Sequence, residues 1–569
     1  MTQRYLPLVD LACAGSAALV WYLALPVGGW PLLLGLLPFA LRLVLTGRLS
    51  VRSAFDKWLL LFLVTAAVAV WSAYDRDVAW EKFWLIVGAV LLFYAFANGM
   101  ARYADLYLYG LAGLGVIVTL FFIATHDWEQ FPTKIAFLEQ IGRALQAPLP
   151  TLDVYRIHPN VIGGLLLFAL PFGAATAKSH RAVGIAATAI ILFGLLLSMS
   201  RGAWIGAVVL GGVALFWSIS ERSARLKPIR PHLFISLTAL ALLLWVLLLV
   251  TAPASLQRVM QLIGGASRTE LWRDGYLLAG DYPLIGAGLG NFTMLHASYA
   301  LLTHVGFIVH AHNIFLDLSI EQGLLAVVAL VGMWSSFGRV VFADRQRPNR
   351  ALTAAGLSVI GIAVHGLFDD ALYGSGGLVF LFIPLAFAVQ DGATRPSRVA
   401  WRRLAIPAGI AVIAFLFTWR MVAGVAVANW AAVRQSQTEL AVYSWPEWEI
   451  QDAVRRSAEL AQIVQGYQRS LTLYPNHAAA NRRLGQVELS LGEYGDALDH
   501  LQQAHEVQGW ADTVRQLYGE ALLASGQVDE GDAMWKTVRQ EQAQLQLRAF
   551  WYSQLDDVSL KQRITDASR

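Results

Sequence analysis

The residues best suited to chemistry lie within 267–323, the longest polar stretch of an otherwise apolar chain. Arginine presents a planar fork of N–H donors that matches phosphate oxygens, and a neutral histidine can accept a proton from a hydroxyl. Arg268 stands four residues before Trp272, so the two share one face of a helix. His312 and Asn313 begin an apolar run, which places an imidazole at the rim of a membrane span. These residue types could bind an anion and remove a proton. The spacing leaves the alternatives open: Arg268 could form an ion pair with Glu270, Asp274 or Asp281, and His312 could only cap a helix or lie at the interface.

Four residues outside this stretch are further candidates. Arg201 lies between two apolar runs with almost no loop, where an arginine is costly in lipid and usually faces a cavity or a partner. The alternative is that Arg201 snorkels to the interface beside Trp204. His365, Asp369 and Asp370 end another apolar run. Their carboxylates could orient a histidine, bind sugar hydroxyls or form a solvated turn, and the sequence leaves these alternatives open.

Two motifs in the polar stretch suggest sites that we do not favour. The run Gly286-Ala287-Gly288-Leu289-Gly290 could present backbone N–H groups to an anion, but its spacing is no known nucleotide motif. A tight turn that allows close helix packing is the favoured interpretation. His310 and His312 lie two residues apart without an H-E-x-x-H motif or a cysteine pair, so we expect no metal and no cofactor.

Composition places the site in a membrane protein. The chain has 569 residues, of which 57% are hydrophobic and 14% are charged, whereas soluble domains carry about 25% charged residues. A polytopic helical membrane protein is therefore predicted, with membrane lipid as a partner and no nucleic acid.

Thirteen apolar runs approach the roughly 20 residues that span a bilayer. They cover about 6–25, 30–47, 57–74, 80–99, 106–125, 159–178, 182–200, 202–220, 232–252, 323–343, 351–367, 372–390 and 404–429. Lys and Arg are concentrated in the loops that would be cytoplasmic if the N-terminus is inside. The large loop at about 253–322, Arg201 and the chain after Trp430 would then all be outside.

The composition after Trp430 is that of a soluble domain, and it contains a repeat of 34 residues. Gly485 recurs as Gly519 and Leu501 as Trp535 at this spacing. The pattern resembles the tetratricopeptide repeat, a pair of helices whose small residues allow close approach. An earlier unit is expected at about 441–474, and a terminal helix at about 536–555. Because so few repeats are marginally stable alone, we expect them to pack on the membrane domain or on the terminal helix.

Taken together, these residues resemble the superfamily of O-antigen ligases and polymerases, glycosyltransferases of the bacterial inner membrane. The resemblance covers about 155–325. It consists of Ser200-Arg201-Gly202, of Arg268 with Trp272, of the run Asp281-x-Pro-Leu-Ile-Gly-x-Gly-x-Gly-x-Phe, and of His312-Asn313 followed after nine residues by Gly323. Ala326 stands where the ligases often have Gly, Thr or Tyr, so the pattern distinguishes ligase from polymerase poorly.

The resemblance implies a metal-independent enzyme that uses an undecaprenyl-pyrophosphate-linked glycan donor on the periplasmic face. Arg201 and Arg268 would hold the donor pyrophosphate, and His312 would activate the acceptor hydroxyl. Asn313, Trp272, His365, Asp369 and Asp370 would contribute to substrate binding. The acceptor would be a glycolipid, a glycan or a protein, and the tail would offer a platform to a protein or glycan partner.

We therefore predict an all-α protein of two parts: a GT-C-like membrane domain of about 12–13 helices at 1–430 and a helical-repeat domain at 431–569. The first functional interpretation is a glycan ligase. The second is a polysaccharide polymerase or a protein O-oligosaccharyltransferase on the same scaffold. The third is a transporter or flippase, which should place its ionisable residues near the bilayer midplane instead of at one membrane face.

Overall fold

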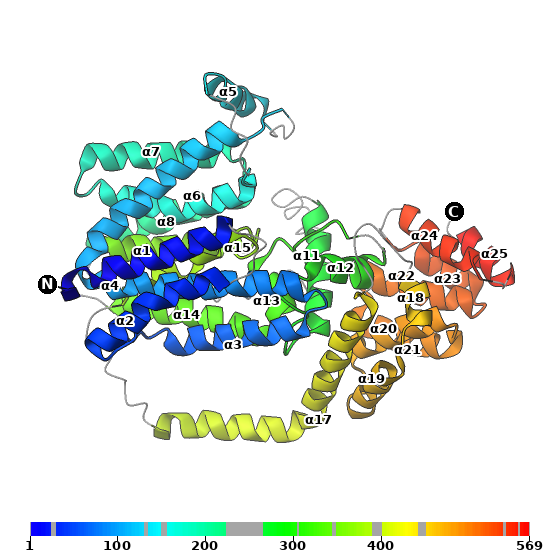
Figure 1. Cartoon of the computed structure of the whole chain (residues 1–569). Coiled ribbons are helices and arrows are strands. Elements are labelled where there is room, and N and C mark those ends of the chain that lie inside the picture. Colours follow the sequence, from blue (N-terminus) through cyan, green and yellow to red (C-terminus); the bar gives the residue numbers. More distant parts are fainter. Residues whose placement is uncertain are drawn as a thin grey trace.

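The computed structural model is helical throughout the part of the chain that it describes, with no strand in those residues (Figure 1). It describes residues 2–23, 30–129, 135–149, 156–222, 266–303, 306–343, 349–389, 401–441, 451–538, 542–555 and 558–567. The prediction of an all-α membrane protein is confirmed over these ranges. The span expected at 232–252 and part of the large loop lie outside them.

Three groups of helices follow one another along the chain. The membrane block contains α1 (Thr2–Leu23), η1 (Trp30–Leu36), α2 (Leu37–Thr46), α3 (Asp56–Ser72), α4 (Arg76–Thr125), α5 (Ala136–Gln146), α6 (Pro159–Thr176), α7 (Arg181–Leu197), α8 (Arg201–Arg222), α14 (Leu324–Ala343), α15 (Arg350–Gly366), η4 (Gly376–Leu381) and α16 (Ile383–Ala386). The polar stretch forms α11 (Ala266–Asp281), α12 (Phe292–His296), η3 (Ala297–Leu301) and α13 (Ile314–Gln322). The tail contains α17 (Trp401–Glu439), α18 (Gln451–Ser457), α19 (Ala461–Leu473), α20 (Ala478–Leu491), α21 (Tyr494–Gln508), α22 (Asp512–Ala524), α23 (Val528–Trp535), α24 (Gln542–Ser553) and α25 (Val558–Ala567).

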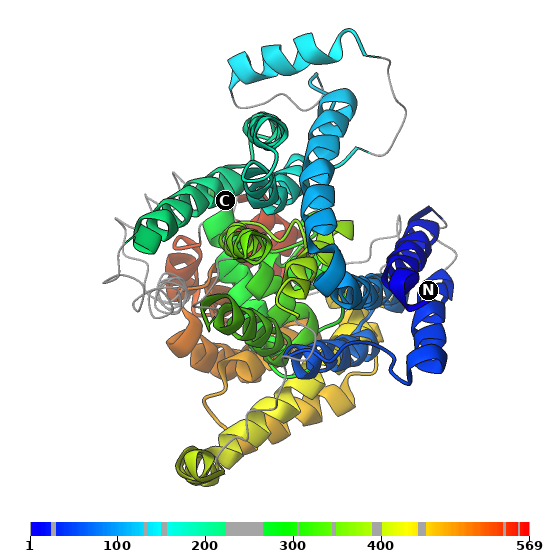
Figure 2. The same ribbon diagram turned by 90° about the vertical axis from the view of Figure 1, so that its left-hand side faces the viewer.

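Five helices in the described ranges are long and apolar enough to cross a membrane. They are Arg76–Thr125, Pro159–Thr176, Arg201–Ile219, Leu324–Val341 and Leu416–Glu439. Shorter apolar helices, including α7 and α15, stand beside them. In the end-on view of Figure 2 these helices form a bundle, from which α5 projects at one edge and α17 at the opposite edge.

The expected spans 80–99 and 106–125 are two helical arms that join at a kink, and no loop separates them around Arg102. Together they form α4, which has 50 residues. It bends at Tyr103, whose φ of −116° and ψ of 17° are not helical. Figure 1 shows the two arms diverging from this bend. The connecting residues contain neither proline nor glycine between Met100 and Leu108, so nothing in the sequence stops the helix.

The expected span at 372–390 is also not a single helix. The chain forms the 3-10 helix η4 and the four-residue α16 instead. Gly374, Gly376 and Gly377 disfavour a regular helix at the start of this segment, and Pro384 removes a backbone donor further on. Both short elements pack against α4. The segment therefore fills the interior of the block.

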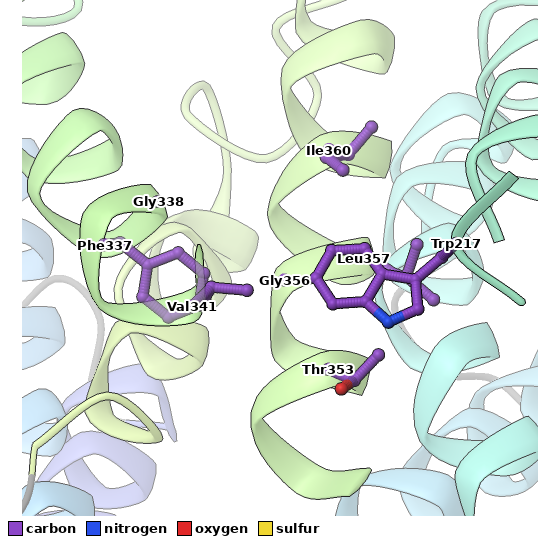
Figure 3. A pocket seen from close by; sticks show the side chains of 8 residues that line it. All are labelled: Trp217, Phe337, Gly338, Val341, Thr353, Gly356, Leu357 and Ile360. Atoms are coloured by element: carbon purple, nitrogen blue, oxygen red, sulfur yellow. The ribbon is translucent and has the colours of Figure 1, made fainter. Parts of the chain in front are cut away.

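Several membrane helices have one end at the same place, and this arrangement builds the site. α8 begins with Arg201, α15 ends beside His365, and α14 begins directly after α13. Gly202 allows the close approach of α8 to the loop after α15, because a Cβ atom there would lie 3.1 Å from Cβ of Phe368. The opposite ends of α8, α14 and α15 surround a small apolar pocket in which Trp217 faces Leu357 (Figure 3). The polar residues are thus gathered at one end only.

In the tail, helices pair at the positions that the repeat predicts. A Cβ atom on Gly485 of α20 would lie 2.6 Å from Cγ of Leu501 in α21. A Cβ atom on Gly519 of α22 would lie 2.4 Å from Cδ1 of Trp535 in α23. Only glycine fits at such distances, so both pairs need it. In α19, which lies in the earlier unit expected at about 441–474, Tyr467 donates a hydrogen bond to Gln435 of α17 at 2.6 Å. The boundary expected at residue 430 falls inside α17.

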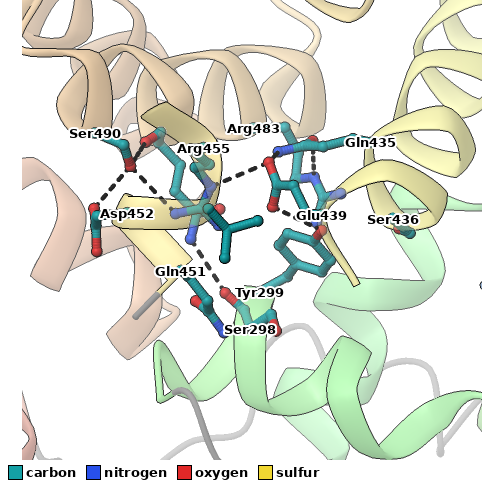
Figure 4. Close-up of polar contacts among 12 residues, drawn as sticks. Ser298, Tyr299, Gln435, Ser436, Glu439, Gln451, Asp452, Arg455, Arg483 and Ser490 are labelled. Carbon is teal, nitrogen blue, oxygen red and sulfur yellow. Dashed lines mark hydrogen bonds and ion pairs between the residues drawn. The ribbon is translucent and has the colours of Figure 1, made fainter. Parts of the chain in front are cut away.

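The tail packs directly on the polar stretch, with which it shares a hydrophobic core. Arg482 of α20 forms an ion pair with Asp281 at the end of α11, and the N–O distance is 2.5 Å. Both side chains are completely buried. Figure 4 shows neighbouring contacts: Arg455 pairs with Glu439 at 3.1 Å, and Glu439 accepts a hydrogen bond from Tyr299 at 2.9 Å. The tail and the polar stretch therefore lie on the same side of the membrane block.

Candidate functional site

The central histidine of the site lies in a tight turn before α13. Asn313 caps this helix, because its side chain accepts hydrogen bonds from the backbone N–H groups of Phe315 and Leu316. His312 has a φ of 52°, in the left-handed region that residues with a side chain rarely adopt. The indole of Trp272 donates to the carbonyl oxygen of His312 at 3.3 Å. Trp272 therefore contacts the His-Asn motif directly.

His312 and Asp369 form a dyad. Nδ1 of His312 lies 3.3 Å from Oδ2 of Asp369, and the imidazole is 27% exposed while the carboxylate is 3% exposed. The same oxygen accepts from Arg268 at 3.2 Å and from the side-chain amide of Asn160 at 2.5 Å. The sequence left open whether Asp369 orients a histidine or forms a solvated turn. The structure favours the first alternative.

The charge state of Asp369 determines how His312 can act. Burial alone would raise the pKa of Asp369, but the hydrogen bond from His312 and the positive charge of Arg268 outweigh burial and lower it. An ionised carboxylate favours the tautomer of His312 in which Nδ1 carries the proton and Nε2 carries the lone pair. Nε2 of His310 lies 3.0 Å from the same Nδ1, and it can accept from Nδ1 in this tautomer. The free lone pair on Nε2 of His312 is what a general base needs.

Two arginines stand beside the dyad. Arg268 donates to the carbonyl oxygen of Phe368 at 2.8 Å in addition to Asp369, and its side chain remains 16% exposed. Burial and the nearby cation of Arg201 lower the pKa of Arg268, while Asp369 opposes them. Arg201 is half-buried at the first position of α8. Two cations that repel each other at a partly open surface form a suitable site for a polyanion such as pyrophosphate.

All five of the expected substrate-binding residues are buried. Asn313, His365, Asp370, Asp369 and Trp272 are 0%, 1%, 2%, 3% and 4% exposed, respectively. His365 contacts Gly202 and Gly164 on the neighbouring helices, and Oδ1 of Asp370 lies 3.3 Å from Nε2 of His310. His312, Arg268 and Arg201, in contrast, remain partly exposed.

The structure brings together four groups of the kind that can bind a metal. One ligand atom from each of His310, His312, Asp369 and Asp370 lies within 4.8 Å of the others. The sequence had not connected the two histidines with the two aspartates. However, Oδ2 of Asp369 already accepts from three donors, and Oδ1 accepts from the backbone N–H of Ala371. A cation at Oδ2 would compete with Arg268 and Asn160, which supports the interpretation of Asp369 as a hydrogen-bonded partner of His312.

The glycine-rich run serves helix packing, as the sequence favoured. Gly286 and Gly288 have φ values of 70° and 115°. A Cβ atom on Gly286 would lie 2.2 Å from the carbonyl oxygen of Glu321, at the end of α13. The N–H of Gly288 donates to this carbonyl oxygen and the N–H of Ala287 donates to Ile320. These N–H groups are therefore engaged in the fold.

Three residues that sequence reasoning missed lie around the His-Asn turn. Asn160, in the first turn of α6, donates to Asp369. Asp317 and Glu321 are buried on α13, where Asp317 contacts the turn and Glu321 pairs with Lys82 of α4 at 2.8 Å. A signal was present, because Asn313, Asp317 and Glu321 recur every four residues and so share a helix face.

The comparisons with known proteins agree with this site. Residues 186–331 match the family described as O-antigen ligase. The matched segment contains Arg201, Arg268, Trp272, His312 and Asn313, whereas Asp369 and the tail lie beyond it. A search of curated proteins finds no match. The resemblance seen in the sequence is thus confirmed over residues 186–331, which are similar to the O-antigen ligase family.

Proposed function

We propose that this protein transfers a glycan from an undecaprenyl-pyrophosphate-linked donor to a hydroxyl group of an acceptor, at the periplasmic face of a bacterial inner membrane. The observation that carries the proposal is the dyad of His312 and Asp369 beside Arg268. This transfer requires a base and a phosphate-binding cation at one site.

The reaction can be written with the residues of the site. Nε2 of His312 accepts the proton of the acceptor hydroxyl as the oxygen attacks the anomeric carbon of the donor. The bond between that carbon and the pyrophosphate oxygen breaks, and the lipid pyrophosphate leaves with the electron pair. Arg268 and Arg201 stabilise the negative charge of the leaving group. Because pyrophosphate is already a good leaving group, positioning and anion stabilisation supply much of the rate.

The proposed reaction needs no metal. Two arginines provide the positive charge that Mg²⁺ provides in many reactions of phosphorylated substrates. The oxygens of Asp369 are engaged by Arg268, Asn160, His312 and Ala371. We therefore expect transfer to continue after treatment with EDTA.

Ligase activity is our first choice among the acceptor classes. Polymerase or protein O-oligosaccharyltransferase activity would use the same dyad and differ only in the molecule that supplies the hydroxyl. The tail would contribute to this choice, since it packs against the polar stretch that carries His312 and Arg268. A transporter is less well supported, because the described ionisable residues of the site gather at one end of α8, α14 and α15.

The experiment is an assay of the purified protein with a lipid-pyrophosphate glycan and a panel of lipid, glycan and protein acceptors. We expect glycan transfer to one acceptor class in the presence of EDTA. Surface glycans of a deletion strain then separate the two leading activities: loss of all capped polymer indicates a ligase, and chains of a single repeat indicate a polymerase. Turnover on no acceptor, combined with uptake of the glycan into vesicles, would contradict the proposal in favour of transport.

The orientation has its own test. A cysteine at Ser525, an exposed position of the tail, should react with a membrane-impermeant thiol reagent in intact spheroplasts. The single native cysteine, Cys13, is replaced by serine so that only the new thiol reports. Labelling that occurs only after lysis would place the tail, and with it the site, in the cytoplasm.

A further inference from the structure

The backbone of His312 needs an explanation that the dyad does not give. A residue with a side chain is held in the left-handed region, at a φ of 52°, only where its surroundings over-determine it. Asp369 binds the imidazole, and Trp272 binds the carbonyl oxygen of His312. The contact of Trp272 reaches the peptide group after His312, but neither contact holds the backbone before it.

Asp317 contacts the backbone on both sides of His312. Its Oδ1 accepts a hydrogen bond from the backbone N–H of Ala311 at 2.7 Å, and its Oδ2 lies 3.4 Å from the backbone nitrogen of Asn313. The backbone N–H of Asp317 in turn donates to the carbonyl oxygen of Asn313 at 2.9 Å. One carboxylate therefore holds the chain immediately before and immediately after His312.

The turn is also tied to the other half of the dyad. The side-chain amide of Asn313 donates to the carbonyl oxygen of Leu367 at 2.8 Å, two residues before Asp369. A displacement of the turn would thus change the distance between His312 and Asp369. The contacts of Asp317 bear directly on the geometry of the dyad.

The surroundings of Asp317 make it an unusual choice for a purely structural role. Its side chain is 1% exposed, and within the described ranges it forms no ion pair. The charged groups around it include Glu321, Asp370 and Lys82, and Lys82 is paired with Glu321. Burial raises the pKa of Asp317 to about 7, with the charge of Glu321 adding to the effect. A buried carboxylate without a cation is costly, so a gain elsewhere must offset it.

We propose that Asp317 is a positioning residue for catalysis: its carboxylate holds the strained turn of His312 so that Nε2 faces the acceptor hydroxyl. The inference rests on the proposed role of His312 as the base. According to this inference, the first turn of α13 holds the backbone conformation of the reactive histidine that precedes the helix.

The test is a double-mutant cycle between Asp317 and His312. Asp317→Asn keeps one acceptor oxygen but presents an N–H₂ group to a backbone N–H, and Asp317→Glu keeps the charge but moves both oxygens. Each should lower kcat by about 10–100-fold, because a displacement of about 1 Å at a reacting group costs that much. The KM for the lipid-pyrophosphate donor should stay unchanged. Ser319→Ala is the matched control on the same helix, because Ser319 bonds only to the carbonyl oxygen of Phe315.

In the His312→Ala background, Asp317→Asn should cause no further loss of the residual single-turnover rate, since the base that it positions is gone. An equal fold-loss in both backgrounds, or full activity of Asp317→Asn, would overturn the inference. A His312→Ala enzyme with normal turnover would instead remove the proposed base itself. Failure of the inference and failure of the proposed function are therefore distinguishable. If Asp317→Asn does not fold, the same cycle is carried out with Asp317→Glu.

Discussion

Two buried ionic clusters lie near each other, one at the site and one between the tail and the polar stretch, and they differ in balance and exposure. In the tail cluster, four arginines pair with four carboxylates. These pairs are Arg482 and Arg483 with Asp281, Arg455 with Glu439, and Arg548 with Asp452 and Glu520. Their side chains are at most 2% exposed, except that of Arg548 at 12%. In the site cluster, Arg268 and His312 remain 16% and 27% exposed.

The site cluster also contains more carboxylates than its fixed cations can pair. Asp317, Asp369, Asp370 and Glu321 are all buried. The ion pairs of Arg268 and Lys82 serve only Asp369 and Glu321. A closed, balanced cluster gives a fold specificity, whereas an open and unbalanced one keeps groups in reactive protonation states. Both regions contain buried charged side chains, so burial alone does not distinguish the site from the tail cluster.

The largest expected effect is on turnover, in the open cluster. His312→Ala should lower kcat by about 10²–10⁴-fold, because it removes the general base. Donor affinity should change little, since Arg268 and Arg201 remain. The measurements are the transfer rate and the donor affinity of the purified variant. The control is His180→Ala, at the residue directly before α7. Normal turnover of His312→Ala would leave the arginines acting by anion stabilisation alone.

The closed cluster should respond in stability instead. Asp281→Ala leaves Arg482 buried without its carboxylate, which costs about 3–5 kcal/mol. The midpoint of thermal unfolding in detergent should fall strongly, while the folded fraction keeps its turnover. Asp529→Ala, at an exposed position of α23, is the control. If Asp281→Ala lost turnover but kept its unfolding midpoint, the tail cluster would belong to the catalytic machinery and the distinction between the clusters would fail.

A smaller effect should follow when the charge of a cation is kept and only its shape is changed. Arg268→Lys loses the second N–H contact of the fork, and we expect a loss of about 10–100-fold in kcat/KM, as for a charge-assisted hydrogen bond of about 1.5–3 kcal/mol. The measurement is the rate at limiting donor concentration. Arg273→Lys on the same helix should remain close to wild type. Full activity of Arg268→Lys would show that a point charge suffices at this position.

The sequence identified the open cluster better than the closed one. Arg201, Arg268 and His312 were found because each belongs to a local motif with a chemical interpretation. The pairing of His312 with Asp369 was only one of several alternatives, since 57 residues separate them. The ion pair of Arg482 with Asp281 spans 201 residues, and nothing local marks either residue. Contacts of this kind follow from the docking of whole helices, which hydrophobic periodicity does not determine.

The fold was predictable to a similar extent. Helix positions followed from the apolar runs, and the break before Arg201 lies where the sequence placed it. The direct joining of the two arms of α4 and the irregular segment after Asp370 were missed. In both cases the length and hydropathy of a run were right, but its backbone path depended on local residues. Good helix formers carried α4 through its bend, and glycines broke the later segment.

The smallest effect concerns acid stability of the closed cluster. Burial would raise the pKa of Asp452, but the charges of Arg548 and Arg455 outweigh it and lower the value to about 2. A lowered pKa in the folded state gives stability that is present above the unfolded value of about 4 and is lost as the pH falls towards 2. Between pH 5 and pH 2 this loss should be about 2 kcal/mol for Asp452. Asp452→Asn cannot titrate, so the difference in unfolding free energy between wild type and this variant should shrink by that amount over the same range. A difference that stays constant would mean that Asp452 is not held ionised by Arg548, and the closed cluster would then lack the charge balance that distinguishes it from the site.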